Sequence, residues 1–496
     1  MNLPKALYRA AQVRALDRTA IEDFNMPGIH LMENAGAATF HAMRFRWPRA
    51  RRIAVFCGGG NNGGDGFVIA RLAHEHGLAS RVYLLAEPAR LKGDARLAFD
   101  KLQQAGVSVQ PFDVSMAQDA DVIVDALLGT GLDGEVRNQW RAAIDWINRA
   151  KTETQCRVVA VDIPSGLHAD TGSVLGVAIR ADLTVTFIGV KQGLLTADGP
   201  DYCGELLFDN LGVDQAVYQR VEYATTRIDQ EEVARLLQPR AKGAHKGNNG
   251  HVLVIGGNKG MIGAASMAGQ AALRAGAGMV TVATRQSHVA AIVAACPEIM
   301  CHGVESVAEL KPRIAAATCV AVGPGLGQDE WAKAMLGAVL ESAKPLVVDA
   351  DALNLLSREP VKRDNWVLTP HPGEAGRLLG MSTADIQRDR FAAVSTLQSR
   401  YGGTVVLKGS GSLVCGSGGA ISLCHAGNPG MASAGMGDVL TGVLAACIAQ
   451  TGELDHSARA AVVIHARAGD LAAIDGQRGL MATDLLIPIR QICNPV

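Results

Sequence analysis

The sequence lacks the features that mark several large classes of protein. No uninterrupted apolar run is long enough to cross a bilayer, and the N-terminal segment contains no apolar core of a secretory signal. An excess of one charge is also absent, because 47 basic and 48 acidic residues leave a net charge of −1. That balance argues against a nucleic-acid-binding or membrane-surface protein. We therefore expect a cytoplasmic protein with no membrane and no nucleic-acid partner.

Cysteine and aromatic residues are also scarce. The 10 cysteines are scattered and form no Cys-x-x-Cys pair, so neither structural zinc nor a disulfide framework is supported. Aromatic residues make up 4% of the chain, whereas glycine occurs 56 times, which is more typical of an α/β enzyme with many tight turns than of a β-sandwich. A chain of 496 residues is too long for one ordinary core, so we expect at least two domains.

Short apolar strands alternate with helical segments through the first half of the chain. Strands are expected at 52–57, 81–86, 121–126, 157–162 and 183–188, and helices at 11–24, 31–45, 67–76, 94–104 and 140–149. This alternation predicts a doubly wound parallel sheet, in which ligands bind beyond the carboxyl ends of the strands.

Three polar loops lie at such strand ends. Residues 58–66 contain the fingerprint Gly-x-Gly-x-x-Gly, but Asp65 would repel a nearby pyrophosphate, which argues against an ordinary nicotinamide dehydrogenase. The other two loops are 125–135 and 162–166. Together the loops offer an amide oxygen, a carboxylate and a hydroxyl, which suit an alkali or alkaline-earth cation better than zinc. These groups belong to Asn62, Asp125 and Ser165. Alternatively, each residue only caps a turn or helix.

These loops, together with the segment 31–36, resemble those of the NAD(P)H-hydrate epimerase family, the YjeF N-terminal domain, over roughly residues 10–210. That family binds NAD(P)HX, in which water has added to the nicotinamide ring, and interconverts its two epimers. The resemblance implies that Asp162 handles a proton, that Asn62, Asp125 and Ser165 bind potassium, and that Lys191 lies near the ring. The hydrate-binding residues it implies are Asn61, Asn62, Gly63, Gly64, Asp65, Gly129, Thr130, Gly131, Leu132, Asp133, Gly134, Glu135 and Asp162.

A domain boundary is expected near residue 222, giving domains 1–222 and 223–496. In the second domain, strands are expected at 251–255, 279–283, 320–322, 346–348 and 366–368, and helices at 229–237, 264–275, 331–340, 384–401 and 439–449. This is again an α/β pattern with a parallel sheet. The chain contains no Gly-x-x-x-x-Gly-Lys-Ser/Thr, so it is not a P-loop protein.

The stretch 428–442 is a glycine-rich turn that runs into an apolar helix. Such a turn leaves backbone N–H groups without partners, and with the helix dipole they form a site for a phosphate, here at Gly435 and Gly437. Asp438 places a carboxylate in the same turn. Its expected role is to take a proton from a hydroxyl while the amides hold the phosphoryl group. Alternatively, Asp438 is only a helix N-terminal acid favoured by the dipole.

The motifs at 369–374 and 428–438 occur in an order that resembles the ribokinase-like superfamily. More narrowly, they resemble the ADP/ATP-dependent NAD(P)H-hydrate dehydratase over roughly residues 225–490. The resemblance implies that Asp438 activates the ring hydroxyl, which is phosphorylated and then eliminated. Glu374 is a candidate indirect magnesium partner, although His371 stands where sugar kinases carry Asn. Hydrate binding is implied for Ala264, Gly325, His371 and Asp438, and nucleotide binding for Lys408, Gly409, Ser410, Gly411, Ser412 and Gly437.

The resulting prediction is a bifunctional enzyme with a Rossmann-like N-terminal and a ribokinase-like C-terminal domain, both doubly wound. It epimerises R- and S-NAD(P)HX and dehydrates S-NAD(P)HX at the expense of ADP, giving AMP and phosphate. We expect K⁺ in the first domain, Mg²⁺ in the second, and a homo-oligomer. The alternatives are a small-molecule kinase fused to a nucleotide-binding domain, and a non-enzymatic binding module.

Overall fold

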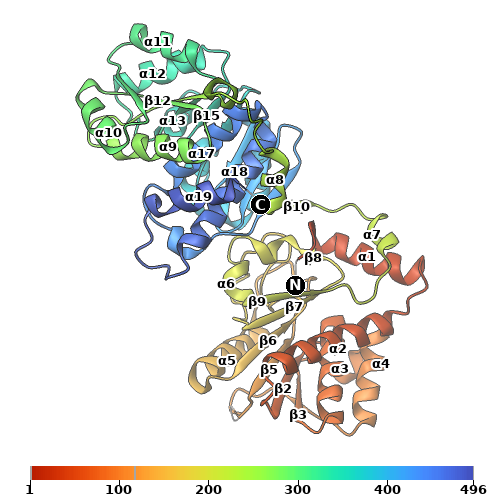
Figure 1. Ribbon diagram of the computed structural model, residues 1–496. Coiled ribbons are helices and arrows are strands. Elements are labelled where there is room, and N and C mark those ends of the chain that lie inside the picture. The colour runs from red at the N-terminus through yellow and green to blue at the C-terminus, as the bar shows by residue number, and fades with distance from the viewer. Residues whose placement is uncertain (1–2, 117–118, 495–496) are drawn as a thin grey trace. The chain divides into compact units, whose positions relative to one another are not determined.

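The computed structural model describes residues 3–116 and 119–494, and it divides into two compact units (Figure 1). Unit 1 is Met1–Thr226 and unit 2 is Arg227–Val496, so the division falls four residues beyond the expected boundary at 222. Within the described residues, every helix is too short or too polar to span a membrane.

Unit 1 is built on a seven-stranded sheet in which all neighbouring strands are parallel. In spatial order the strands are β4 (Ser108–Pro111), β3 (Ala79–Leu84), β2 (Arg52–Cys57), β5 (Val122–Ala126), β6 (Arg157–Val161), β7 (Leu183–Phe187) and β9 (Glu205–Asp209). The chain moves outward from β2 through β3 to β4 and then returns to the other side of β2. The loops after β2 and β5 therefore diverge, which creates the crevice where ligands bind in such sheets.

Helices cover both faces of this sheet (Figure 1). One face carries α1 (Ala10–Glu22), α2 (Gly28–Arg46), α3 (Asn61–Glu75) and α4 (Gly93–Gln104), and the other carries α5 (Asn138–Thr154). Alternate residues of β2 serve the two cores: Val55 packs with the first group and Phe56 with α5. The remaining elements are α6 (Gly199–Cys203), α7 (Gln215–Tyr218), and β1 (Ala6–Tyr8), which pairs with β8 (Val190–Lys191) and β10 (Thr225–Arg227).

Helix α3 begins at Asn61, so the expected start at residue 67 was wrong. Gly60 is the N-cap, and the second half of the fingerprint forms the first turns of the helix. Close packing explains the glycines: a Cβ at Gly58 would lie 2.0 Å from the carbonyl oxygen of Leu127, and one at Gly63 would lie 2.0 Å from that of Gly58. The glycines thus bring strand, turn and helix into backbone contact.

Unit 2 contains a nine-stranded run of sheet. In spatial order its strands are β13 (Met300–Gly303), β12 (Met279–Thr284), β11 (His251–Ile255), β14 (Cys319–Val322), β15 (Leu346–Val348), β16 (Trp366–Leu368), β17 (Thr404–Leu407), β18 (Ser412–Cys415) and β19 (Ile421–Cys424). The pairs from β13 to β17 are parallel, but β17–β18 and β18–β19 are antiparallel. The five predicted strands β11, β12, β14, β15 and β16 are therefore parallel as expected, and the antiparallel edge is formed by strands that were not predicted. Only residues 408–411 connect β17 to β18, too few for a crossover helix.

The helices of unit 2 are α8 (Gln230–Leu236), α9 (Ile262–Arg274), α10 (Val289–Ala295), α11 (Val307–Ala316), α12 (Glu330–Leu340), α13 (Ala350–Arg358), α14 (Pro372–Leu379), α15 (Thr383–Arg388), α16 (Arg390–Tyr401), α17 (Met436–Thr451), α18 (Leu454–Ala472) and α19 (Leu486–Ile492). The single helix expected at 384–401 is two helices, because Asp389 leaves the helical conformation and its side chain caps α16 at the amide of Ala392. Helix α17 is apolar on all sides and packs between α9 and α18.

Candidate active sites

Unit 1 contains a cavity of about 580 Å³ at the carboxyl ends of β2, β5 and β6. The expected hydrate-binding residues that line it are Asn61, Asn62, Asp65, Gly129, Thr130, Gly131, Leu132 and Asp162. Five further expected residues are not part of the lining: Gly63, Gly64, Asp133, Gly134 and Glu135. A Cβ at Gly64 would lie 2.6 Å from the sulfur of Met32, so this glycine serves helix packing.

An ion pair between Lys191 and Asp162 lies at one side of the cavity. Lys191 is fully buried and donates to Oδ1 of Asp162, which also accepts the backbone amide of Phe187 at 3.1 Å. Asp162 has a left-handed backbone, with φ 66°, directly after β6. An unusual conformation in a residue that is not glycine is a strain that surrounding contacts must maintain, and it commonly occurs at functional positions. The fold thus holds Oδ1 of Asp162 with these donors, whereas Oδ2 accepts no hydrogen bond from the described residues.

Two further carboxyl groups line the same cavity, Asp65 on α3 and Asp17 on α1. Burial, with the nearby charges of Asp162 and Asp17, raises the pKa of Asp65 well above its usual value, and Lys191 opposes the shift. Burial followed by the charge of Asp162 raises the pKa of Asp17 to about 6. The ammonium of Lys191 therefore acts on a group of carboxyl groups, two of which, Asp17 and Asp65, hold a proton more readily than an ordinary aspartate.

Of the three residues expected to hold a cation, Asn62 lines this cavity, whereas Asp125 and Ser165 are buried outside its lining. Asp125 and Ser165 are fully buried, and the Ser165 hydroxyl donates to Asp125 at 2.6 Å. Both amide atoms of the Asn62 side chain are buried without a hydrogen-bond partner. A buried amide without partners is costly unless a ligand completes it. A Cβ at Gly129 would lie 3.3 Å from Cβ of Asn62, which places Asn62 against the loop after β5.

The second site forms at the N-terminus of α17. Gly435 is the N-cap, with φ 89°, a conformation that only glycine adopts readily. Within the described part of the chain, no hydrogen bond is donated by the backbone amides of Met436, Gly437 and Asp438. These amides are therefore available to an anion, as the sequence predicted from the glycine-rich turn.

Asp349, directly after β15, connects this turn to its surroundings. It is 1% exposed, and its two oxygens accept from Lys408 Nζ at 2.7 Å and from Thr441 Oγ1 at 2.7 Å. Lys408 Nζ also lies 3.8 Å from Oε2 of Glu374. A Cβ at Gly437 would lie 3.3 Å from the same nitrogen, so the ammonium stands beside the unpaired amides of α17.

Asp438 faces this cluster and has a strongly altered acidity. Burial raises its pKa to about 7, the charges of Asp349, Asp351 and Glu374 act in the same direction, and Lys408 opposes them. A carboxyl group with a pKa near neutrality exchanges protons readily at physiological pH, which suits a general base. A merely dipole-stabilised helix acid would have the opposite shift.

The hairpin turn 408–411 is organised by a buried arginine. Arg390 is fully buried, and its guanidinium donates to the backbone oxygens of Leu407, Lys408 and Gly411. A Cβ at Gly409 would lie 2.8 Å from that guanidinium. Ser412 closes the turn by donating to the oxygen of Gly409 at 3.1 Å. The expected nucleotide-binding stretch 408–412 is thus a fixed turn whose first residue reaches Asp349.

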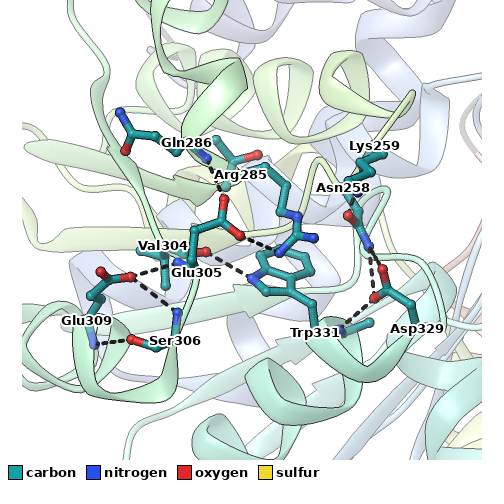
Figure 2. A network of polar contacts seen from close by, with 12 residues as sticks. Asn258, Lys259, Arg285, Gln286, Val304, Glu305, Ser306, Glu309, Asp329 and Trp331 are labelled. Atoms are coloured by element: carbon teal, nitrogen blue, oxygen red, sulfur yellow. Dashed lines mark hydrogen bonds and ion pairs between the residues drawn. The ribbon is translucent and has the colours of Figure 1, made fainter.

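Gly325, Ala264 and His371 lie in the loops at the same carboxyl edge. A Cβ at Gly325 would lie 3.2 Å from that of Ala264, so these two expected residues adjoin. His371 caps α14, accepting the amides of Gly373 and Glu374 at Nδ1. The two strand-end loops 256–261 and 323–329 are tied together by Asn258, which donates to both oxygens of Asp329 at 3.0 Å (Figure 2).

Beside this tie, the Arg285 guanidinium lies over the Trp331 ring, 5.0 Å from its centroid, and pairs with Glu305 at 2.6 Å (Figure 2). The Trp331 ring nitrogen donates to the carbonyl of Val304. These contacts tie the loops after β12 and β13 to α12, the helix that follows the loop carrying Gly325.

Sequence reasoning assigned no role to Asp17, Asp349 and Arg390. A signal existed for Asp17, because it shares the helical spacing of the buried Val13 and Leu16. No signal distinguishes Asp349 from other acids at strand ends, since its partners lie 59 and 92 residues away in sequence.

Fold and sites together define an α/β enzyme of two units, with a strand-end cavity in unit 1 and, in unit 2, unpaired helix amides beside a lysine and a carboxyl group of raised pKa. Residues 28–193 match the family described as YjeF-related protein N-terminus, and residues 252–491 match NAD(P)H-hydrate dehydratase. The chain therefore combines two families in one polypeptide.

Whole-chain relatives agree with this combination. The chain is 49% identical over 490 residues to the bifunctional NAD(P)H-hydrate repair enzyme Nnr of Coxiella burnetii, covering 99% of both chains. It is 44% identical over 498 residues to the enzyme of that name from Escherichia coli, covering 100% of this chain and 95% of the other. A ribokinase-like superfamily protein of solved structure from Enterococcus faecalis is 29% identical, with a TM-score of 0.51, covering 54% of this chain and 94% of that one. The chain belongs to the family of bifunctional NAD(P)H-hydrate repair enzymes, as the sequence motifs predicted.

Proposed function

We propose that the protein repairs hydrated NADH and NADPH in two steps. Unit 1 interconverts the R and S hydrates, and unit 2 removes water from the S hydrate at the expense of a nucleoside diphosphate. The observation that carries the proposal is the placement of Asp438. Its carboxyl group lies in the first turn of α17, next to unpaired amides and Lys408, and its pKa is raised to about 7. This arrangement supports transfer of a phosphoryl group onto a hydroxyl.

In unit 2, the Asp438 carboxylate takes the proton of the ring hydroxyl as that oxygen attacks the terminal phosphorus of ADP. The oxygen–phosphorus bond forms, the bridging bond of ADP breaks, and AMP leaves. The amides of α17 and the Lys408 ammonium face the phosphoryl group and stabilise its charge. Phosphate then departs from the ring with the electron pair of its carbon–oxygen bond, a ring proton is lost, and the dihydronicotinamide is restored.

Magnesium fits this site as an ion carried by the nucleotide. In the described residues, no group of three or more acidic, His or Cys side chains is arranged to hold a metal by itself. Mg²⁺ commonly binds through phosphates, water and one carboxylate, and it neutralises charge on the transferring group. We assign Glu374 as the carboxylate that contacts Mg²⁺ indirectly. Its Oε2 lies 3.8 Å from Lys408 Nζ, so Glu374 belongs to the cluster of charged groups that faces the phosphate. We propose ADP as the donor from the sequence resemblance.

In unit 1, we place the hydrate in the 580 Å³ cavity, against Asn61, the loop after β5 and the carboxyl group of Asp162. We propose K⁺ as the cation of Asn62, Asp125 and Ser165. The unpartnered buried amide of Asn62 supports this assignment, since an oxygen ligand set of amide, carboxylate and hydroxyl matches a hard cation. Bound there, the cation would fix the loops that border the cavity. A domain boundary near 222 and assembly into a homo-oligomer stay predictions.

The decisive experiment supplies purified protein with a mixture of R and S hydrates, ADP and Mg²⁺. We expect the absorbance of reduced nicotinamide to return for the whole mixture, because epimerisation feeds the dehydratase. Accumulation of a stable phosphorylated product without reduced nicotinamide would instead identify a small-molecule kinase. Binding of the hydrates without any turnover would identify a binding module and overturn the proposal.

A further inference from the structure

A carboxyl group on α1 lines the cavity of unit 1. Asp17 lies on the buried face of the helix, between the buried residues Val13, Leu16 and Ala20. The side chain is only partly exposed, and it is among the residues that line the cavity. A charged side chain on the core face of a helix is unfavourable and calls for a functional or structural partner.

No structural partner explains Asp17. Within the described residues, no hydrogen bond or ion pair is recorded for its carboxyl group. The charged groups that line the cavity with it are Arg14, Asp65, Asp94 and Asp162. Lys191 on β8 and Tyr218 on α7 also act on it electrostatically. Lys191 is already bound to Asp162, so Asp17 faces the cavity without a cation of its own.

Asp17 and Asp162 meet different partners in the same cavity. Burial together with the Asp162 charge raises the pKa of Asp17 to about 6, whereas Oδ1 of Asp162 accepts from an ammonium and a backbone amide. Two carboxyl groups with different surroundings in one cavity are a common arrangement for paired acid and base catalysis. Both groups line the same cavity, from α1 and from the end of β6.

We propose that Asp17 is a catalytic acid of the epimerase site and works opposite Asp162; this rests on the proposed function of unit 1. Water adds to dihydronicotinamide at the ring carbon beside the nitrogen, so the substrate is a hemiaminal. The carbon–oxygen bond breaks with its electron pair on oxygen, Asp17 supplies a proton, and water leaves. The ring nitrogen stabilises the cation. A water molecule adds to the opposite face and gives its proton to Asp162, and exchange with solvent resets both groups.

The test uses the full-length protein without ADP, so that the dehydratase is silent, and follows conversion of one purified epimer into the other by chromatography. We expect Asp17→Asn to lower kcat for epimerisation by about 100-fold or more, with KM within about threefold, because a positioned acid contributes on the order of 10²–10⁴. Asp17→Glu should restore part of the rate. Dehydration of the S hydrate with ADP should be unchanged in both variants, which shows that unit 2 is folded, and the retained KM for epimerisation shows that the cavity of unit 1 is intact.

Asp23→Asn is the matched control, because Asp23 caps the same helix and pairs with Arg220 at the surface. We expect it to epimerise at the wild-type rate. The wild-type kcat/KM should fall as pH rises above about 6, when Asp17 loses its proton, and this decline should disappear in Asp17→Asn. In H₂¹⁸O, each conversion should introduce one labelled oxygen into the product.

Epimerisation by Asp17→Asn within threefold of wild type, or a defect confined to KM, would overturn the inference. Conversion without label would contradict the bond cleavage on which it depends. If the wild-type protein interconverts the epimers no faster than the uncatalysed reaction does, the proposed function of unit 1 is overturned as well. The two failures are therefore distinguishable.

Discussion

The ammonium of Lys408 lies 2.7 Å from Oδ1 of Asp349; the Asp349 side chain is almost completely removed from solvent, and that of Lys408 is 18% exposed. Burial works to lower the pKa of Lys408, but the charges of Asp349 and Glu374 raise it above its usual value. The lysine therefore remains a cation at any physiological pH. A permanent positive charge is thus fixed beside the amides of α17, where a phosphoryl group would arrive, before any nucleotide binds.

Removing one member of this pair should be costly. Asp349→Ala removes the closest partner of Lys408, leaves it only Glu374 at 3.8 Å, and frees Thr441, so we expect a loss of roughly 3–5 kcal/mol in the free energy of unfolding. Urea denaturation of Asp349→Ala, Lys408→Met and the double variant would measure the coupling, and the double variant should lose less than the sum of the two. Lys333→Ala, which breaks an exposed pair with Glu330, should cost less than about 1 kcal/mol. Additive losses would contradict direct coupling.

The Asp438 carboxyl should govern the pH dependence of dehydration. A base acts only when deprotonated, so kcat/KM should rise with pH through about 7 and level off above it. Asp438→Asn should reduce dehydration by about 100-fold or more at every pH while epimerisation continues. Asp475→Asn, at an exposed position of the same unit, serves as the control. A pH profile that is flat between 6 and 8 in the wild type would contradict this assignment.

Two nearby glycines of unit 1 should respond differently to a methyl group. A Cβ at Gly58 would lie 2.0 Å from a backbone oxygen, whereas nothing lies within 4 Å of one at Gly60. We expect Gly58→Ala to cost about 1–3 kcal/mol or more and to lower the melting temperature of unit 1. Gly60→Ala, whose φ of −101° is accessible to alanine, should melt like the wild type. Equal melting temperatures for both variants would show that the turn relaxes around the added group.

Potassium should stabilise unit 1 independently of catalysis. A ligand that binds only the folded state raises the melting temperature as its concentration increases. We expect KCl to do so relative to choline chloride at equal ionic strength. The effect should vanish in Asn62→Leu, which removes the unpartnered amide. Identical melting curves in the two salts would rule out potassium at this position.

The sequence predicted the parts of the fold that local patterns determine. Strand β2 has its predicted bounds, because a run of buried apolar residues ends at a glycine. The edge strands β4 and β9 were not predicted, since β4 is largely exposed and lacks an apolar run, and the apolar run of β9 is only three residues long. The break at Asp389 was missed because the side chain of Asp389 caps the next helix by a hydrogen bond to the backbone, and the periodicity of apolar residues does not reveal such a bond.

In the candidate sites, too, the sequence predicted the residues that a local motif brings together but not those that depend on distant contacts. The turn at Gly435 and the acid at Asp438 are contiguous in sequence, and motif reasoning predicted them together. Arg390 could not be assigned, because a buried guanidinium is recognised only by the carbonyls that fold around it. Asp17 likewise acquires its significance from the cavity that residues of other elements complete.

Helix α17 carries Asp438 at one end and is otherwise enclosed by the core of unit 2. Amide hydrogens of such a helix exchange with solvent only when the whole domain opens. The base therefore cannot swing toward or away from its substrate, and any closing motion during turnover belongs to the loops opposite it. Heat inactivation of the dehydratase should coincide with cooperative unfolding of the domain and show no earlier, local loss of activity.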